Sequence, residues 1–247
     1  MWKLVKYELR KQMQSKAIIF GIVALLELVW FFGLFVKNSM LPGTSGLLFL
    51  VANISMIYLY FESIVTFSND LKTKNSYMLF MTPNSSYKIV GAKIVASGIQ
   101  IILYGLCFFG IGALDIGIMA IRFSGVSEVI EMIKKFLNQS VQIDVDITYV
   151  FLSVLSIIIM GIFILSLAYV SITLSATFLA NKPYKGFVSF VIFVLIVFVQ
   201  EKIVSAVLGN VLLSDQTTII LSLVWYAVMS VLAYVVTAWM LDKRVSL

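Results

Sequence analysis

Hydrophobic residues occur in six long runs that are separated by shorter polar segments. The runs cover residues 17–36, 47–67, 93–121, 148–172, 187–208 and 219–241. An α-helix rises about 1.5 Å per residue, so about 20 apolar residues cross the roughly 30 Å hydrocarbon core of a bilayer. The pattern therefore predicts an all-α integral membrane protein with about six transmembrane helices in a single transmembrane domain over residues 1–247.

Polar residues interrupt the fifth run. Residues 187–199 are wholly apolar, Gln200, Glu201 and Lys202 follow, and then a second apolar stretch begins. Residues 187–199 rise only about 20 Å as a helix, which is less than the hydrocarbon core. Either the helix continues with these polar groups buried in protein, or it stops and residues 200–217 form a re-entrant segment. We favour the re-entrant segment.

Two of the shorter segments have the spacing of amphipathic helices. In residues 1–16, apolar side chains recur at helical spacing and basic side chains form a separate face. The apolar positions are Trp2, Val5, Leu9 and Met13, and the basic ones are Lys3, Lys6 and Arg10. This pattern predicts an interfacial helix on the inner leaflet, or a helix that only anchors the first span. Residues 126–138 repeat the pattern and predict an external helix that lies on the membrane surface or covers an exit path.

The composition leaves lipid as the main solvent of this chain. Hydrophobic residues make up 61% of the chain and charged residues 12%, whereas a soluble domain carries about 25% charged residues. Thirteen of the 18 Lys and Arg residues lie at the N-terminus, between the second and third runs, between the fourth and fifth, and after the sixth. These segments share one side of the membrane, so the positive-inside rule predicts that both termini are cytoplasmic.

Several residue types needed for catalysis or metal binding are missing. The chain has no histidine and a single cysteine, Cys107, so His-based catalysis, a Cys metal cluster and an intrachain disulfide are excluded. Cys107 lies in an apolar run and is expected to be a small buried side chain. No GxxxxGK[ST] phosphate loop occurs. We therefore predict no catalytic residue and no metal site, and any ATPase would be a separate polypeptide.

Three acidic residues lie inside the apolar runs: Glu27, Glu62 and Asp115. A charge at bilayer depth costs several kcal/mol unless it is paired or neutralised. They are candidates for a substrate path or a subunit interface, or for hydrogen bonds that hold the helices together. Asp115 is near the outer end of its run, where its side chain could simply reach the headgroups.

The segment 68–88 between the second and third runs mixes charged and apolar residues. It reads SNDLKTKNSYMLFMTPNSSYK and lies on the cytoplasmic side by the charge distribution. Pro83 and the serines at 85 and 86 predict that one helix stops there and the next begins. A short helix with exposed apolar residues suits docking to a partner, although any inner loop would carry lysines.

This segment resembles the cytoplasmic loop of bacterial ABC-2-type ABC transporter permease subunits. The matching positions are Phe67, Asp70, Leu71, Lys72, Asn75, Ser76, the stretch 77–81, Thr82, Pro83 and Lys93. The opening WKLVKYELRKQ, the six spans, the cytoplasmic termini and the broken fifth run also resemble this family. The external stretch 122–147 departs from it, since many members have a tighter connection there.

The resemblance implies an ABC-2-type exporter fold and a set of partners. The loop 68–88 would form a coupling helix that docks on an ATPase subunit. The docking residues would be Asp70, Leu71, Lys72, Lys74, Tyr77, Leu79 and Pro83. It also implies two ATPase copies that carry ATP and Mg, a second permease copy or a paralogous permease, and a place in the bacterial plasma membrane as a multi-pass protein. The exported substrate could be an antimicrobial peptide, a drug or a lipid-like molecule, and no nucleic acid is expected.

The alternative is a secondary transporter or channel that uses Glu27 and Glu62 as proton or ion sites. The sequence shows no internal repeat and no matching pair of Gly/Pro-interrupted spans, which such transporters often have. An intramembrane enzyme is disfavoured because the chain lacks histidine and has only one aspartate, Asp115, within its apolar runs.

Overall fold

The computed structural model describes residues 1–36, 41–71, 85–123, 147–179, 184–208 and 215–243. Within these ranges the chain is helical and contains no strand. The helices are α1 (Trp2–Lys11), α2 (Met13–Val36), α3 (Leu41–Asp70), α5 (Ser86–Phe123), α7 (Ile147–Phe178), α8 (Lys185–Leu208) and α9 (Asp215–Lys243). All of them except α1 are long and apolar enough to cross a membrane, which gives six candidate spans. The prediction of an all-α membrane protein with six spans is therefore confirmed at the level of helix length and composition.

Each predicted apolar run lies inside one of these helices, but α8 does not break where we expected. It continues as one helix through Gln200, Glu201 and Lys202 to Leu208. Its 24 residues correspond to about 36 Å of helix, enough to cross the bilayer core. The side chains of Glu201 and Lys202 are exposed rather than buried in protein, and the Lys202 Nζ lies 5.5 Å from the centre of the Phe198 ring. A continuous helix keeps its backbone hydrogen bonds satisfied, which a break at bilayer depth would not.

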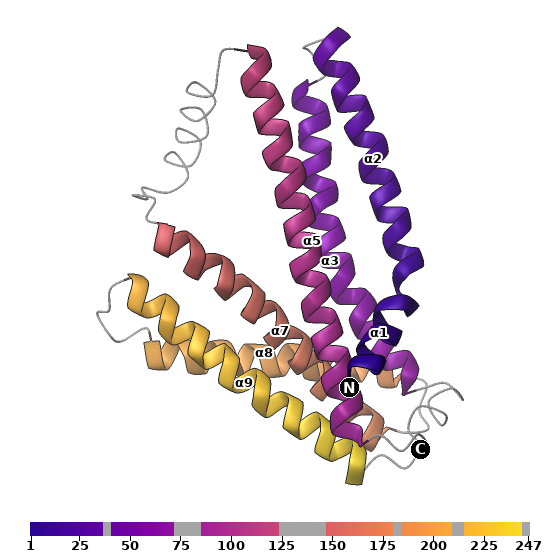
Figure 1. The fold of residues 1–247 in the computed structure, drawn as a ribbon. Helices are drawn as coiled ribbons and strands as arrows, with labels where there is room; N and C mark the ends of the chain where they lie inside the picture. Colours follow the sequence, from indigo (N-terminus) through magenta and orange to yellow (C-terminus); the bar gives the residue numbers. More distant parts are fainter. Residues whose placement is uncertain (37–40, 72–84, 124–146, 180–183, 209–214, 244–247) are drawn as a thin grey trace.

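The spans form two groups that diverge from one end of the molecule (Figure 1). In the first group α3 packs on α2 and α5, and α1 packs on α5. In the second group α7 packs on both α8 and α9. The groups meet where α3 and α5 contact α7, and where α5 contacts α9. We call the end of the molecule where α1 lies, and where the two groups meet, the α1 end.

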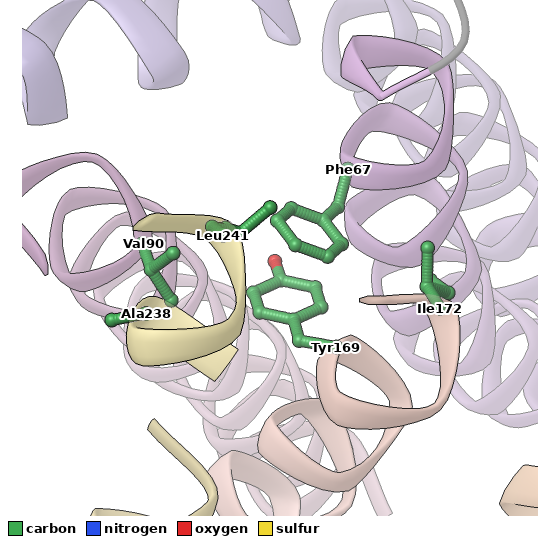
Figure 2. Close-up of a cluster of buried hydrophobic side chains, with 6 residues drawn as sticks. All are labelled: Phe67, Val90, Tyr169, Ile172, Ala238 and Leu241. Atoms are coloured by element: carbon green, nitrogen blue, oxygen red, sulfur yellow. The ribbon is translucent and has the colours of Figure 1, made fainter. Parts of the chain in front are cut away.

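A buried hydrophobic cluster joins the two groups near the α1 end (Figure 2). Phe67 of α3 stacks on Tyr169 of α7 with ring centroids 4.2 Å apart. Such a ring pair contributes about 0.5–1.5 kcal/mol beyond its burial. Val90 of α5 packs in the same cluster against Ala238 and Leu241 of α9. Each of the two groups therefore supplies side chains to one shared core.

A second close approach between the groups depends on a glycine. Gly161 of α7 lies against the phenol ring of Tyr60 of α3, and a Cβ atom at this position would clash with the Tyr60 hydroxyl. The absence of a side chain at position 161 thus allows α3 and α7 to approach each other there.

The apolar face expected for the first helix is divided in the structure. Val5 is buried against Ala92 and Ala96 of α5. Trp2 and Met13 are 71% and 61% exposed. One part of the face is therefore used for protein packing, and the other part is open to the surroundings.

Candidate functional site

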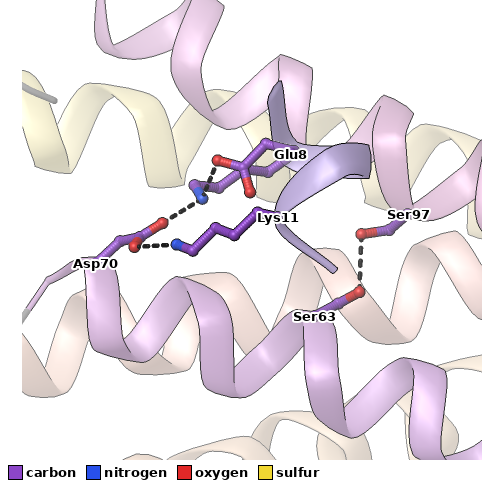
Figure 3. Close-up of polar contacts among 6 residues, drawn as sticks. Glu8, Lys11, Ser63, Asp70 and Ser97 are labelled. Atoms are coloured by element: carbon purple, nitrogen blue, oxygen red, sulfur yellow. Dashed lines mark hydrogen bonds and ion pairs between the residues drawn. The ribbon is translucent and has the colours of Figure 1, made fainter. Parts of the chain in front are cut away.

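The α1 end contains a cluster of charged residues from three helices, and all of them except Lys11 are largely buried. The Lys93 Nζ of α5 donates a hydrogen bond to Glu8 Oε1 of α1 at 2.6 Å and another to Asp70 Oδ2 of α3 at 2.5 Å. The Lys11 Nζ of α1 donates to the other oxygen of Asp70, Oδ1, at 2.7 Å, as Figure 3 shows. We call these four residues the ion cluster.

The charges of the ion cluster balance one another in a buried setting. The side chain of Lys93 is 4% exposed and that of Glu8 is 7% exposed. A buried charge is tolerated only when it is paired and hydrogen-bonded. Asp70 is the last residue of α3, where the helix dipole disfavours a carboxylate. The two lysines that bind Asp70 offset this unfavourable position.

Lys11 is the most accessible member of the cluster, with 37% of its side chain exposed. Burial disfavours its charged form. The hydrogen bond to Asp70 and the negative charges of Asp70 and Glu8 outweigh that effect, and the net result is a raised pKa for Lys11. Lys11 is therefore a cation at neutral pH.

The ion cluster lies at the two ends of the segment 72–84, which contains most of the predicted docking residues. Asp70 precedes this segment and Lys93 lies about two turns into the helix that follows it. Further hydrogen bonds hold the start of α5 to α9. The Ser86 Oγ donates to Asp242 Oδ1 at 3.4 Å, and the Tyr234 hydroxyl donates to the Tyr87 carbonyl at 2.9 Å. Both ends of the segment are thus attached to the membrane helices.

Two of the predicted docking residues are described by the structure. Asp70 is engaged inside the ion cluster, and Leu71 packs against the cluster of Phe67 and Tyr169. The other predicted docking residues lie outside the described residues: Lys72, Lys74, Tyr77, Leu79 and Pro83. The predicted external helix 126–138 lies outside them as well. The expected helix start after Pro83 agrees with α5, which begins at Ser86.

The three intramembrane acids fall into two places. Glu27 of α2 and Asp115 of α5 are close enough to interact electrostatically, and Glu27 Oε1 is buried without a hydrogen-bond partner among the described residues. Glu62 of α3 interacts with Lys16 of α2. The structure therefore brings Glu27 and Asp115 together and places Glu62 in a separate environment.

An apolar groove with a volume of about 330 Å³ lies between α3, α7 and α8. Its apolar lining includes Phe61 and Val65 of α3 and Phe190 and Phe193 of α8. Its few polar lining residues are Ser68, Ser175, Lys185 and Ser189. The volume is within the range of small-molecule sites, and the lining suits an apolar molecule.

Cys107 differs from the expectation, because its side chain is exposed on α5. The side chain lies on the outer surface of α5, which is one of the candidate membrane spans. This single thiol is a convenient site for chemical labelling.

The sequence analysis did not identify Glu8 as a site residue, and it did not predict that Glu8 pairs with Lys93. Glu8 is the only acidic residue among the first 26 residues, and the residues around it are mostly basic or apolar. An isolated acid on one face of an amphipathic helix is a signal that it has a cationic partner elsewhere in the fold. The spacing could not identify that partner, because Lys93 is 85 residues away.

No family model, no curated protein and no solved structure matches this chain.

Proposed function

We propose that this chain is the permease subunit of an ATP-binding cassette exporter with an ABC-2-type fold and cytoplasmic termini in a bacterial plasma membrane. The observation that carries the proposal is the ion cluster. It connects α1, α3 and α5 at the two ends of the segment whose sequence resembles a coupling loop. A loop with such anchored ends can pass a displacement on to the membrane helices.

In this proposal two ATPase subunits bind ATP and Mg, and their closure moves the segment 72–84. Because Asp70 and Lys93 are ion-paired, both ends of the segment move together with α1. The buried cluster around Phe67 and Tyr169 then carries the displacement to α7 and α9. A second permease copy or a paralogous permease completes the translocation path.

The substrate class in this proposal is a peptide, a drug or a lipid-like molecule. The groove between α3, α7 and α8 favours an apolar or amphipathic molecule, since its walls are mostly Phe, Ile, Val and Ala side chains.

The second candidate is a secondary transporter or channel. The specific observation in its favour is the Glu27–Asp115 contact at bilayer depth, together with the unpartnered Glu27 Oε1 among the described residues. In this case Glu27→Gln would reduce transport far more than assembly. An equal loss of assembly would instead indicate a structural hydrogen bond.

The test is purification of the protein from its native membranes in a mild detergent, followed by identification of the co-purifying proteins and an ATP hydrolysis assay. The exporter proposal expects a stoichiometric ATPase subunit, which is lost when Lys72 and Tyr77 are both changed to alanine. The control variant changes two exposed residues near the C-terminal end of α8, Glu201 and Lys202, to alanine. A protein that purifies alone and has no ATP hydrolysis activity would favour the secondary transporter.

A further inference from the structure

Three rows of polar side chains face one another inside the first group of helices. Apart from the adjacent pair Glu62 and Ser63, the members of each row are three or four residues apart, a spacing that places side chains on one face of a helix. The row on α1 and α2 is Glu8, Gln12 and Lys16; the row on α3 is Glu62, Ser63, Thr66 and Asp70; the row on α5 is Lys93, Ser97, Gln100 and Tyr104. We call these residues together the polar seam.

The part of the polar seam nearest the α1 end is paired. Lys93 binds Glu8 and Asp70 in the ion cluster. One turn further along α5, the Ser97 Oγ donates to Ser63 Oγ at 3.0 Å, as Figure 3 also shows. These contacts hold α1, α3 and α5 together.

The inner end of the polar seam is not paired. Gln100 and Tyr104 are each 3% exposed. Among the described residues, neither amide atom of Gln100 has a hydrogen-bond partner, and the Tyr104 hydroxyl and Glu62 Oε2 have none either. At bilayer depth such groups must be satisfied by protein or by water, because lipid tails offer no hydrogen bonds. The geometry therefore indicates a ligand.

The unpaired groups define the chemistry of that ligand. Gln100 Oε1 and Glu62 Oε2 accept hydrogen bonds, whereas Gln100 Nε2 and the Tyr104 hydroxyl donate them. The ligand must therefore donate and accept at once. A metal cation is not required for charge balance, because Lys16 already interacts with Glu62.

A small cavity lies within the paired part of the polar seam, where α1, α3, α5 and α7 meet. Its volume is about 10 Å³, and its lining includes Glu8, Gln12, Ser63, Lys93, Ser97 and Tyr169. A polar cavity of this size holds about one water molecule. The cavity is too small for a larger ligand, and its lining includes Ser97, which lies three residues before Gln100 on α5.

We propose that the polar seam is a hydrated recess that is open to water from the α1 end, and that Gln100, Tyr104 and Glu62 form its inner binding site for water. The rise from Lys93 to Tyr104 is about 16 Å along α5, or roughly half of the hydrocarbon core. The recess gives Glu62 contact with water at this depth. The inference does not depend on the exporter proposal, since it rests only on the packing of α1, α2, α3 and α5 and on Tyr169 of α7.

The first test uses thiol reactivity, because a cysteine reacts as its thiolate, which forms in water and is suppressed in apolar surroundings. Cys107 is replaced by alanine, and Gln100→Cys is compared with Ile101→Cys. Ile101 is a matched control, since it is adjacent and also buried, at 6% exposed. Because burial in apolar surroundings suppresses the thiolate, a small water-soluble thiol reagent should modify position 100 at least about tenfold faster than position 101. Equal rates would overturn the hydrated recess.

The second test uses the unaltered protein, so it does not depend on how a variant folds. Radiolytic hydroxyl-radical labelling oxidises tyrosines beside bound water. Tyr104 should be oxidised several-fold faster than Tyr226, although Tyr226 is the more exposed of the two. Both rings pack against phenylalanines, but of the two only the Tyr104 hydroxyl is buried without a hydrogen-bond partner among the described residues, so it would bind water. Oxidation of Tyr104 no faster than that of Tyr226 would show that the inner end of the seam is dry.

Discussion

The ammonium group of Lys93 lies 2.5 Å from the carboxylate of Asp70. Asp70 belongs to α3, which precedes the segment 72–84, and Lys93 belongs to α5, which follows it. Their pairing therefore fixes the two ends of that segment relative to each other. Glu8 binds the same ammonium group and adds α1 to the arrangement. One lysine therefore determines how three helices meet at the α1 end.

Replacing Lys93 with methionine should strongly destabilise the protein. The change leaves the carboxylates of Glu8 and Asp70 close together, with only Lys11 to compensate them, and breaking a buried ion pair in this way costs about 3–5 kcal/mol. Thermal unfolding in detergent measures the effect. The control is Lys88→Met, since Lys88 is an exposed lysine on the same helix. Equal melting temperatures for the two variants would show that the ion cluster contributes little to stability.

The contribution of Lys11 should disappear only at high pH. Its pKa is raised in the folded protein above the ordinary value of 10.5. A raised pKa means that the pairing stabilises the fold fully below about pH 10.5, and that this stabilisation is lost as the pH rises through the folded-state pKa. The melting temperatures of the original protein and of Lys11→Met should therefore differ at pH 8 and converge at alkaline pH. A difference that is unchanged at alkaline pH would argue against the charge pairing.

The contact between α3 and α7 should be sensitive to one methyl group. Gly161→Ala places a Cβ against the Tyr60 hydroxyl, and overpacking of this kind costs about 1–3 kcal/mol. Adding Tyr60→Phe removes the clashing oxygen and should restore most of the stability. Gly110→Ala is the control, since a Cβ there meets no atom within 4 Å, and it should be neutral or slightly stabilising. Failure of the second change to rescue the first would place the strain elsewhere.

The sequence predicted the spans well because the signal is local. An uninterrupted run of about 20 apolar residues specifies a spanning helix without reference to the rest of the chain. The continuous α8 was missed because exposed polar residues in a long helix resemble a break. Lys202 instead lies near Phe198 on the helix surface, where a long side chain can extend its charge toward water.

The pairing in the site could not be predicted because it depends on long-range packing. Asp70 was assigned to partner docking from its position in the loop motif, and the structure places its side chain between Lys11 and Lys93. Lys93, Ser97, Gln100 and Tyr104 have the spacing of one helix face, but the sequence analysis did not identify this row. Which of these groups are paired and which are not became clear only when α3 was placed opposite α5.

The exporter proposal predicts that contact with the ATPase and transmission of its motion can be separated. Changing both Tyr77 and Leu79 to alanine should abolish co-purification of the ATPase, because these side chains are proposed to dock on it. In the Glu8→Gln variant the ATPase should still co-purify in stoichiometric amounts. The variant loses the ion pair between α1 and Lys93 but keeps the ion pair between Lys93 and Asp70. The Glu8→Gln complex should therefore lose the stimulation of ATP hydrolysis that the permease provides over the isolated ATPase. If the Glu8→Gln variant lost the ATPase subunit as fully as the loop variant does, the ion cluster would shape the docking surface itself. The proposed division between docking and transmission would then be wrong.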